Sequence, residues 1–258
     1  MSELKEFEEH DKFPEQYEIN HKLKSPLNCL WYNKRNVFPD NYPAKMPEDF
    51  ARDMILWYSK PGNLVWDCFN GSGTVVRKAL ELGRKAIGTD VNPKAIDLSK
   101  RHDPEHQSCY GLGDVRTVKL ETKADLVFTS PPFGVSIGGD KNNYSNEKAD
   151  LSNTDSIDSF LKLIRPAFDN IFDNLKPNGL FIFDARDRTK DGKYYDLSVI
   201  FRNMAIEVGF KVHCKYFYFD MPWSLYTYKN KENDQIMPDV STTDAYVMFK
   251  PENQRLFQ

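Results

Sequence analysis

Several features that would mark a particular class of protein are missing from this sequence of 258 residues. It has only four cysteines, Cys29, Cys68, Cys109 and Cys214, with no CxxC pair and no histidine at metal-ligand spacing. This pattern argues against a zinc finger or a disulfide framework, and it predicts reduced thiols and no metal site. The sequence also has no signal peptide and no apolar run long enough to span a bilayer, so we expect a cytoplasmic protein with no membrane partner.

An excess of positive charge is missing as well. The formal net charge is −3 and the pI is near 6.0, so any nucleic-acid binding would depend on a local basic surface rather than on bulk charge. The hydrophobic content of 40% is enough for the core of one α/β domain. We therefore expect an N-terminal arm at residues 1–35 and a single domain at residues 36–258.

The stretch that organises the chain runs from Leu64 to Leu82. The apolar run Leu64-Val65-Trp66 ends in Asp67 and is followed by a turn that contains Gly71 and Gly73. Apolar residues then recur at helical spacing up to Leu82. A strand, a tight turn and a helix open a βαβ unit, and ligands bind at such turns. The two glycines lack a Cβ, so the backbone can turn sharply and a ligand can approach closely.

The residues after this turn decide between ligand classes. A P-loop needs Lys and then Ser or Thr after its last glycine, whereas Thr74-Val75 follows here; a dinucleotide fingerprint needs a third small residue, and position 76 is Val. Asp67 suits an ammonium group, and Asp90, about 20 residues past the turn, can accept ribose hydroxyls. Asp114, after a third predicted strand, is placed to meet an adenine amino group. This combination fits S-adenosylmethionine.

A second signal follows the fourth predicted strand, Asp125–Thr129, in the run Ser130-Pro131-Pro132-Phe133. The prolines fix φ and remove two N–H donors, so the backbone is stiff and presents carbonyl acceptors. Ser130 adds a hydroxyl acceptor and Phe133 adds a flat apolar ring. Such a site fits the exocyclic amino group of a flipped base. A cytosine-C5 enzyme would instead need a nucleophilic Cys at this strand end, and none is present.

These motifs carry a family resemblance. Residues 67–74, DCFNGSGT, resemble the cofactor motif of the amino-group DNA methyltransferases, and residues 129–133, TSPPF, resemble their catalytic motif. The segment from Tyr42 to Glu48 is similar to the one that closes over the methionine end of the cofactor. The cofactor motif precedes the catalytic motif, and Cys68 replaces the usual Pro. The resemblance covers roughly residues 36 to 215.

The resemblance implies an α/β fold, the Rossmann-like seven-stranded sheet of S-adenosylmethionine-dependent methyltransferases with helices on both faces. It implies a catalytic set of Ser130, Pro131, Pro132 and Phe133, and S-adenosylmethionine as the cofactor. The residues expected at the cofactor are Lys45, Asp67, Phe69, Gly71, Gly73, Thr74, Asp90, Asn92 and Asp114.

The substrate implied is double-stranded DNA with the target base flipped out, as in the DNA methylation of restriction–modification systems. Ser at the first catalytic position favours cytosine N4 over adenine N6. Alternatives are adenine N6, a base amine in RNA, and a cofactor-binding subunit without activity that serves a larger modification complex. No long recognition domain is visible, which leaves a homodimer or a separate specificity partner open.

Two segments are candidates for target contacts. Residues 135–155 are polar and lack periodicity, and we expect a loop that closes over the base or the DNA through Lys141 and Tyr144. Arg186 and Arg188 belong to a charged loop that could contact phosphates, and residues 220–243 could form a small target-reading insertion.

The remaining pattern predicts a helix that begins at Pro47, followed by further helices and strands. The other helices are expected from Asn92 to about Arg101, over Ile157–Asn174 and over Tyr195–Val208, and the other strands over Lys85–Thr89, Ser108–Leu112, Leu180–Asp184, Lys211–Phe219 and Asp244–Phe249.

Overall fold

The computed structural model describes residues 29–33, 42, 45–133, 145, 147–190, 193–221, 227–229, 236–238 and 242–252, with the backbone alone at 29–33, 188–190, 219–221, 227–229, 236–238 and 242. Within these ranges no helix is long and apolar enough to cross a membrane. The elements in chain order are β1 (Cys29–Asn33), α2 (Glu48–Tyr58), β2 (Leu64–Asp67), α3 (Thr74–Glu81), β3 (Lys85–Asp90), α4 (Pro93–His102), the 3₁₀ helix η3 (Pro104–Cys109), β4 (Tyr110–Leu112), β5 (Ala124–Thr129), α5 (Ile157–Asn174), β6 (Leu175–Ala185), β7 (Arg188–Lys190), β8 (Lys193–Tyr195), α6 (Leu197–Val208), β9 (Lys211–Met221), β10 (Thr227–Lys229), β11 (Ile236–Pro238) and β12 (Thr242–Phe249).

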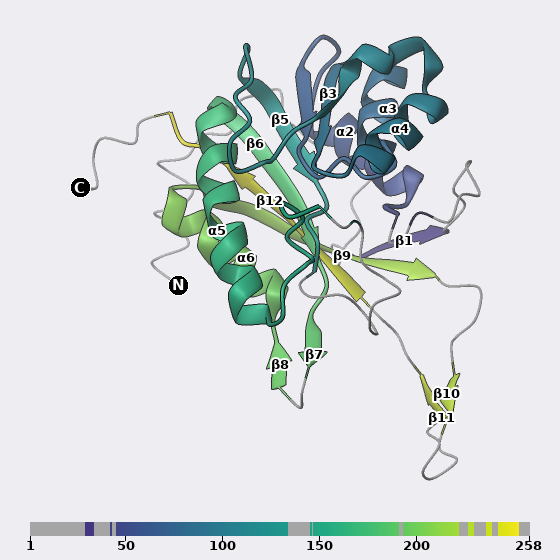
Figure 1. Ribbon diagram of the computed structural model, residues 1–258, viewed down its shortest axis with the longest axis vertical. Coiled ribbons are helices and arrows are strands. Elements are labelled where there is room, and N and C mark those ends of the chain that lie inside the picture. Colours follow the sequence, from purple (N-terminus) through teal and green to yellow (C-terminus); the bar gives the residue numbers. More distant parts are fainter. Residues whose placement is uncertain are drawn as a thin grey trace.

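One mixed sheet with the strand order β1-β9-β12-β6-β5-β2-β3-β4 forms the centre of the fold (Figure 1). Strands β2 to β6 are parallel to one another, whereas β12 is antiparallel to both β6 and β9. The strand order reverses beside β2, because β3 lies on one side of it and β5 on the other. Ligand sites of open α/β sheets lie at the carboxyl ends of the strands next to such a reversal.

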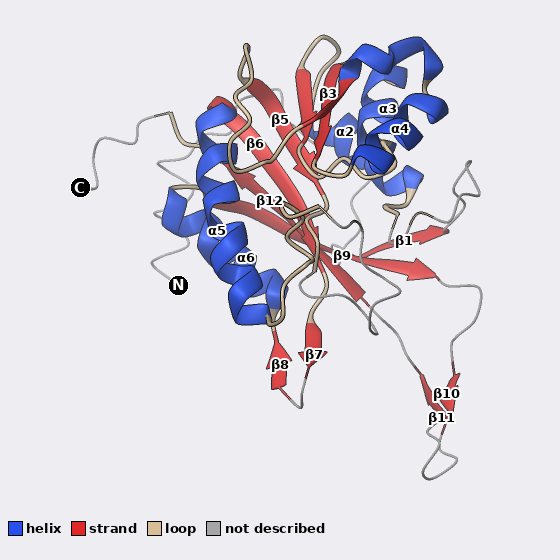
Figure 2. Ribbon diagram, in the orientation of Figure 1, coloured by secondary structure: helices blue, strands red, loops and turns tan. Residues whose placement is uncertain are grey.

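Alternating side chains divide the sheet into two buried faces. On β6, Phe181 and Phe183 pack against α5 and α6, while Leu180 and Ile182 pack on the side of α2, α3 and α4. Figure 2 shows these helices as layers on opposite sides of the strands. A strand covered on both faces reads as a continuous apolar run, which is the pattern of residues 180–183. The predicted helices on both faces are confirmed.

Local signals set the helix boundaries. Asn92 caps α4 by accepting a hydrogen bond from the Lys94 N–H, and Pro93 occupies the first helical position. The Ser156 side chain caps α5, which spans the predicted residues Ile157–Asn174. Gly209 ends α6 in the left-handed conformation, with φ of 119°.

The structure also departs from the sequence expectations. Cys29–Asn33, assigned to an N-terminal arm, pairs in parallel with β9 as an eighth strand beside the seven predicted ones. The third strand was placed too early, because residues 104–109 form the 3₁₀ helix and only Tyr110–Leu112 pair with β3. The fifth strand is longer than expected and begins at Leu175, directly after α5. The charged loop and the proposed insertion each contain a short hairpin, β7–β8 and β10–β11.

A substitution at Phe168 on α5 tests the hydrophobic core between the sheet and helices α5 and α6. Its ring centroid lies 5.8 Å from that of Phe181, 6.1 Å from Phe183 and 5.7 Å from Phe201. Phe168→Ala should therefore lower the free energy of unfolding by about 3–5 kcal/mol through the cavity it creates. Urea denaturation measures this loss. Leu163→Ala on the same helix is the control, because Leu163 is 43% exposed and should change stability by less than about 1 kcal/mol.

Candidate functional site

The turn between β2 and α3 is shaped by its two glycines. Gly71 and Gly73 adopt φ of 51° and 84°, in the left-handed region that favours glycine. The Gly71 N–H donates to the Asp90 carboxylate at 2.8 Å, and the Gly73 N–H donates to the Asn70 carbonyl at 2.9 Å. Asp90 at the end of β3 therefore holds the turn that begins at the end of β2, so the two strand ends form one unit.

Asp67 is buried at the end of β2. Its Oδ1 accepts hydrogen bonds from the Thr129 hydroxyl at 2.6 Å and from the Phe69 N–H at 3.2 Å. Burial raises the pKa of Asp67 to about 7, against the lowering effect of these two hydrogen bonds. A buried carboxylate poised near neutrality gains most from a cationic ligand, which would stabilise its charged form.

Asp90 is a second carboxylate beside the same turn. It accepts from the Gly71 N–H and, at 2.9 Å, from the Asn92 N–H. Burial raises the pKa of Asp90 even though these backbone donors act to lower it.

The predicted catalytic residues begin where β5 ends. Thr129, fully buried, is the last residue of β5, and its hydroxyl also accepts a hydrogen bond from the Phe69 N–H at 3.0 Å. Ser130 and Pro131 follow directly, and the Phe133 ring is 9% exposed and packs into the core on the α5 side. One hydroxyl thus ties the glycine turn to the strand end that carries the SPPF run.

A single pocket brings the two sequence motifs together. Its empty volume is about 890 Å³, including space open to solvent. Of the predicted residues it is lined by Lys45, Asp67, Phe69, Gly71, Thr74, Asp90, Asp114, Ser130, Pro131, Pro132 and Phe133. Gly73 and Asn92 do not line it. Gly73 directly precedes α3, and Asn92 caps α4.

The pocket also has walls that sequence reasoning missed. Met46, Val91 and Val115 each lie next to a predicted residue and supply apolar surface. Asp150 and Leu151 come from the second half of the predicted loop and were not expected at the cofactor. No local signal could have identified these two residues, because their place depends on how the loop returns to the sheet.

Asp114 forms an ion pair with Arg116. Arg116 donates to both of its carboxylate oxygens, with Nη2 at 2.5 Å from Oδ2, and also reaches the Ala149 carbonyl at 3.4 Å. Partial burial acts to raise the pKa of Asp114, but the Arg116 guanidinium holds it below the usual value. Arg116 therefore joins the strand end that carries Asp114 to the segment that supplies Asp150.

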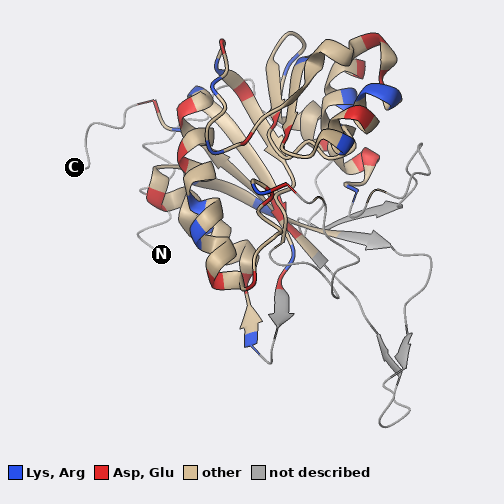
Figure 3. Cartoon of the chain, viewed as in Figure 1, with Lys and Arg blue, Asp and Glu red and all other residues tan. Residues whose placement is uncertain are grey.

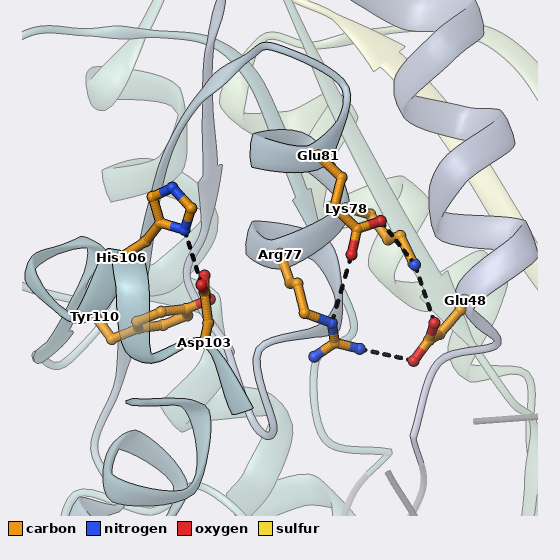
Figure 4. Close-up of polar contacts among 7 residues, drawn as sticks. All are labelled: Glu48, Arg77, Lys78, Glu81, Asp103, His106 and Tyr110. Carbon is orange, nitrogen blue, oxygen red and sulfur yellow. Dashed lines mark hydrogen bonds and ion pairs between the residues drawn. The ribbon is translucent and has the colours of Figure 1, made fainter. Parts of the chain in front are cut away.

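Figure 4 shows a cluster of charged residues that joins α2 to α3. Glu48, buried in the first turn of α2, contacts Arg77 at 2.6 Å and Lys78 at 3.0 Å on α3. Glu48 follows the segment that supplies Lys45 and Met46 to the pocket, so the cluster fixes that segment to the helix after the glycine turn.

The same view shows a second polar cluster, formed by Asp103, His106 and Tyr110. Asp103 accepts from the Tyr110 hydroxyl and lies 2.8 Å from the His106 ring nitrogen. The Tyr110 ring packs beneath Gly73, where a Cβ would lie 3.1 Å from it.

The predicted target contacts are only partly placed. Lys141 and Tyr144 lie outside the described residues. Arg186 follows β6 and donates to the Thr243 hydroxyl at 2.6 Å, and Arg188 begins β7, whose side chains are not described. Neither arginine lines the pocket. Across the described ranges, no cluster of three His, Cys, Asp or Glu residues could hold a metal ion.

The raised pKa of Asp67 gives the first test of the site. An ammonium group attracts only the ionised carboxylate, so affinity for S-adenosylmethionine should fall by about tenfold per pH unit below about pH 7. Isothermal titration calorimetry across this range measures the effect. Asp67→Asn should bind weakly at every pH and lose the step, whereas a flat wild-type profile would contradict the assignment.

Gly88 on β3 gives a second test. A Cβ there would overlap the Asn70 side chain and lie 2.9 Å from the Val76 Cγ2, so Gly88→Ala should displace the glycine turn. Affinity for S-adenosylmethionine should fall by about tenfold or more, which corresponds to about 1.4 kcal/mol. The matched control is Gly111→Ala on the adjacent strand, where no atom lies within 4 Å of a Cβ. Equal losses in both variants would contradict the prediction.

Known proteins resemble the chain at the level of sequence. A family described as DNA methylase matches residues 3–101. A tRNA (guanine(10)-N2)-dimethyltransferase from Methanothermobacter thermautotrophicus is 27% identical over 170 residues, 63% of this chain and 44% of that protein. The DNA adenine methyltransferase YhdJ of Escherichia coli is 39% identical over 87 residues, 34% of this chain and 29% of that protein. The chain thus covers less than half the length of these relatives.

Solved structures resemble it at the level of the fold. TrmN from Thermus thermophilus aligns with a TM-score of 0.55 and 14% identity over 81% of this chain and 50% of that chain. At this identity the likeness concerns the fold alone, the Rossmann-like sheet of S-adenosylmethionine-dependent methyltransferases. The family match over residues 3–101 and the sequence relatives support a relation to the amino-group methyltransferases, and together with the fold they imply S-adenosylmethionine as the cofactor.

Proposed function

We propose that this chain transfers a methyl group to the exocyclic amine of a nucleic-acid base, with cytosine N4 in DNA as its substrate. The observation that carries the proposal is the single pocket, which is walled by the Asp67–Thr74 turn and by Ser130, Pro131, Pro132 and Phe133. The proposal places the cofactor and the base amine in this one pocket, each against one of the two motifs.

The donor set of the pocket fits S-adenosylmethionine. Asp67 would face the ammonium group, Asp90 would accept from the ribose hydroxyls, and Asp114 would meet the adenine amino group. When bound, the cofactor supplies a sulfonium methyl group.

The SPPF run would prepare the amine for attack. Ser130 and the Pro131 backbone offer acceptors to the amine N–H groups, which localises the nitrogen lone pair that is otherwise delocalised into the ring. Phe133 would stack on the base. No covalent enzyme intermediate is needed for this chemistry, because the amine nitrogen is itself the nucleophile.

The cysteine in the pocket supports an amine rather than a ring carbon as the target. Cys68 lines the pocket, but it is buried beside Asp67, and burial raises the pKa of its thiol well above the usual value. A thiol kept protonated is a poor nucleophile, so Cys68 is unsuited to the covalent step of cytosine-C5 methylation. Ser130 at the first catalytic position favours cytosine N4 over adenine N6.

Contacts to DNA would be local. Figure 3 shows Lys and Arg interspersed with Asp and Glu along the helices rather than gathered on one of them. We assign the phosphate and base contacts to Lys141, Tyr144, Arg186 and Arg188, around a base flipped from double-stranded DNA. A second copy or a separate specificity subunit would supply further target recognition.

A guanine amine in RNA is the second candidate substrate. It is favoured by one observation: the match to the tRNA (guanine(10)-N2)-dimethyltransferase extends over 63% of the chain, against 34% for YhdJ. The same pocket chemistry would serve either amine, so the nucleic acid rather than the reaction distinguishes the two candidates.

Transfer of tritium from labelled cofactor tests the proposal. The isolated chain should label DNA, and digestion to nucleosides should place the label in N4-methylcytosine. Label in N6-methyladenine or in a methylated guanosine of RNA would show that the reaction is as proposed but that the substrate is a different base. Absence of transfer to DNA and RNA, with cofactor binding intact, would instead indicate a non-catalytic subunit.

Phe133→Ala tests the base-facing half of the pocket. It should reduce transfer by about a hundredfold or more, because base stacking on an aromatic ring contributes about 1–3 kcal/mol and orients the amine. Cofactor affinity serves as the control for folding and should stay close to wild type. Unchanged turnover in this variant would show that the base does not stack on Phe133.

A further inference from the structure

Asp184 is a buried carboxylate that the pocket does not expose. It is the penultimate residue of β6 and only 2% exposed. Thr129 pairs with Phe183, so the next residues along these parallel strands, Ser130 and Asp184, are neighbours at the carboxyl edge. Asp184 thus lies behind the first residue of the SPPF run.

The two oxygens of Asp184 have different surroundings. Oδ2 accepts a hydrogen bond from the Tyr218 hydroxyl at 2.6 Å. Oδ1 is buried and accepts no direct hydrogen bond from any side chain in the described ranges. Burying an unsatisfied carboxylate oxygen costs free energy, so its retention calls for an explanation.

Ser130 is the hydroxyl placed to use this oxygen. The register of β5 and β6 sets Ser130 beside Asp184, and in keeping with this the interactions with Tyr218 and Ser130 partly lower the pKa of Asp184, which burial raises. Hydrogen bonds of this kind are often long in a free enzyme and shorten when the substrate binds. Ser130 itself lines the pocket, so it lies between Asp184 and the position of the base.

We propose that Asp184 receives, through the Ser130 hydroxyl, the proton that the base amine releases on methylation; the inference rests on the function proposed above. The nitrogen lone pair forms the bond to the methyl carbon, and the electron pair of the carbon–sulfur bond stays on sulfur. The nitrogen then carries a positive charge and gives a proton to the Ser130 oxygen. The hydroxyl's own proton passes to Oδ1, and the neutral Asp184 later returns it to solvent.

Tyr218 is the positioning residue of this relay. Its hydroxyl fixes Oδ2, and its ring stacks on Phe50 of α2 with a centroid distance of 4.3 Å, so the carboxylate cannot rotate freely. The relay therefore has a fixed acceptor, a hydroxyl that connects it to the pocket and a tyrosine that orients it.

The charged neighbours of Asp184 fix the direction of its pH dependence. Asp67 at the end of β2 and Arg186 after β6 interact with it electrostatically, Tyr218 donates from β9, and β12 contributes the uncharged Ala245 opposite it. Arg186 and Tyr218 lower the pKa of Asp184. Loss of either should therefore move its titration to higher pH.

Asp184→Asn is the decisive variant. The amide keeps an acceptor for Tyr218 but cannot take a proton, so kcat should fall by about 10²–10⁴-fold with cofactor affinity unchanged. The acidic limb of the kcat–pH profile, measured at saturating cofactor so that the titration of Asp67 does not contribute, should disappear with it. Asp169→Asn on α5, whose side chain is 59% exposed, is the matched control and should behave as wild type.

Tyr218→Phe gives a readout that a structural role would not produce. Removing the donor to Oδ2 should raise the pKa of Asp184, so the acidic limb should move to higher pH while activity persists above it. Carboxyl ¹³C NMR of the free protein, with the Asp184 signal assigned through its bonds to the backbone resonances of residue 184, should show the same upward shift. This measurement needs no turnover, and it remains available if Asp184→Asn does not fold.

The outcomes separate this inference from the proposed function. If the wild-type chain methylates a base amine and Asp184→Asn has an unchanged kcat and pH profile, the relay is overturned and the proposed function stands. An acidic limb and NMR titration that do not move in Tyr218→Phe also overturn the relay. A wild-type chain that transfers no methyl group to any nucleic acid overturns the proposed function itself.

Discussion

The hydrogen bonds of one buried hydroxyl determine how the rest of the site is arranged. Thr129, at the end of β5, donates to Asp67 and accepts from the Phe69 N–H, both at the end of β2. Because Thr129 is fully buried, these bonds are shielded from water and hold the two strand ends in register. The next residue is Ser130, so its position relative to the glycine turn follows directly. The cofactor motif and the catalytic motif therefore behave as one rigid unit rather than as two loops.

Buried carboxylates are concentrated at the same edge of the sheet. Asp67 and Asp90 end β2 and β3, Asp184 is the penultimate residue of β6, and burial raises the pKa of each. Burying a carboxylate costs free energy, and packing against apolar residues does not offset that cost. The presence of three such groups at one edge of the sheet therefore indicates a ligand-binding site. Backbone N–H groups of the turns after β2 and β3 offset part of this cost at Asp67 and Asp90. Among the residues that the structure describes, the Tyr218 hydroxyl is the one side-chain donor to Asp184, which is thus the least satisfied of the three.

Segments far apart in the sequence complete the pocket walls through specific polar contacts. The Glu48 cluster ties the segment before α2 to α3, and Arg116 ties Asp114 to the backbone at Ala149. Asn170 of α5 donates to the carbonyls of Val115 and Val118 and so fixes the loop that follows Asp114. These contacts connect both helical layers to the ligand-facing edge. The geometry of the pocket thus depends on the packing of the whole domain as well as on its two motifs.

The sequence by itself determined the elements whose signals are local. The glycine turn, the carboxylates at the strand ends and the helix Ile157–Asn174 follow from side-chain spacing and caps, which act within a few residues. Only the tertiary structure decided that Cys29–Asn33 joins the sheet, that Asp150 and Leu151 wall the pocket, and that Asp184 lies behind Ser130. Each of these depends on which strands become neighbours or on where a long loop returns. Such long-range pairing is set by the burial of both sheet faces at once, and no stretch of the sequence records it alone.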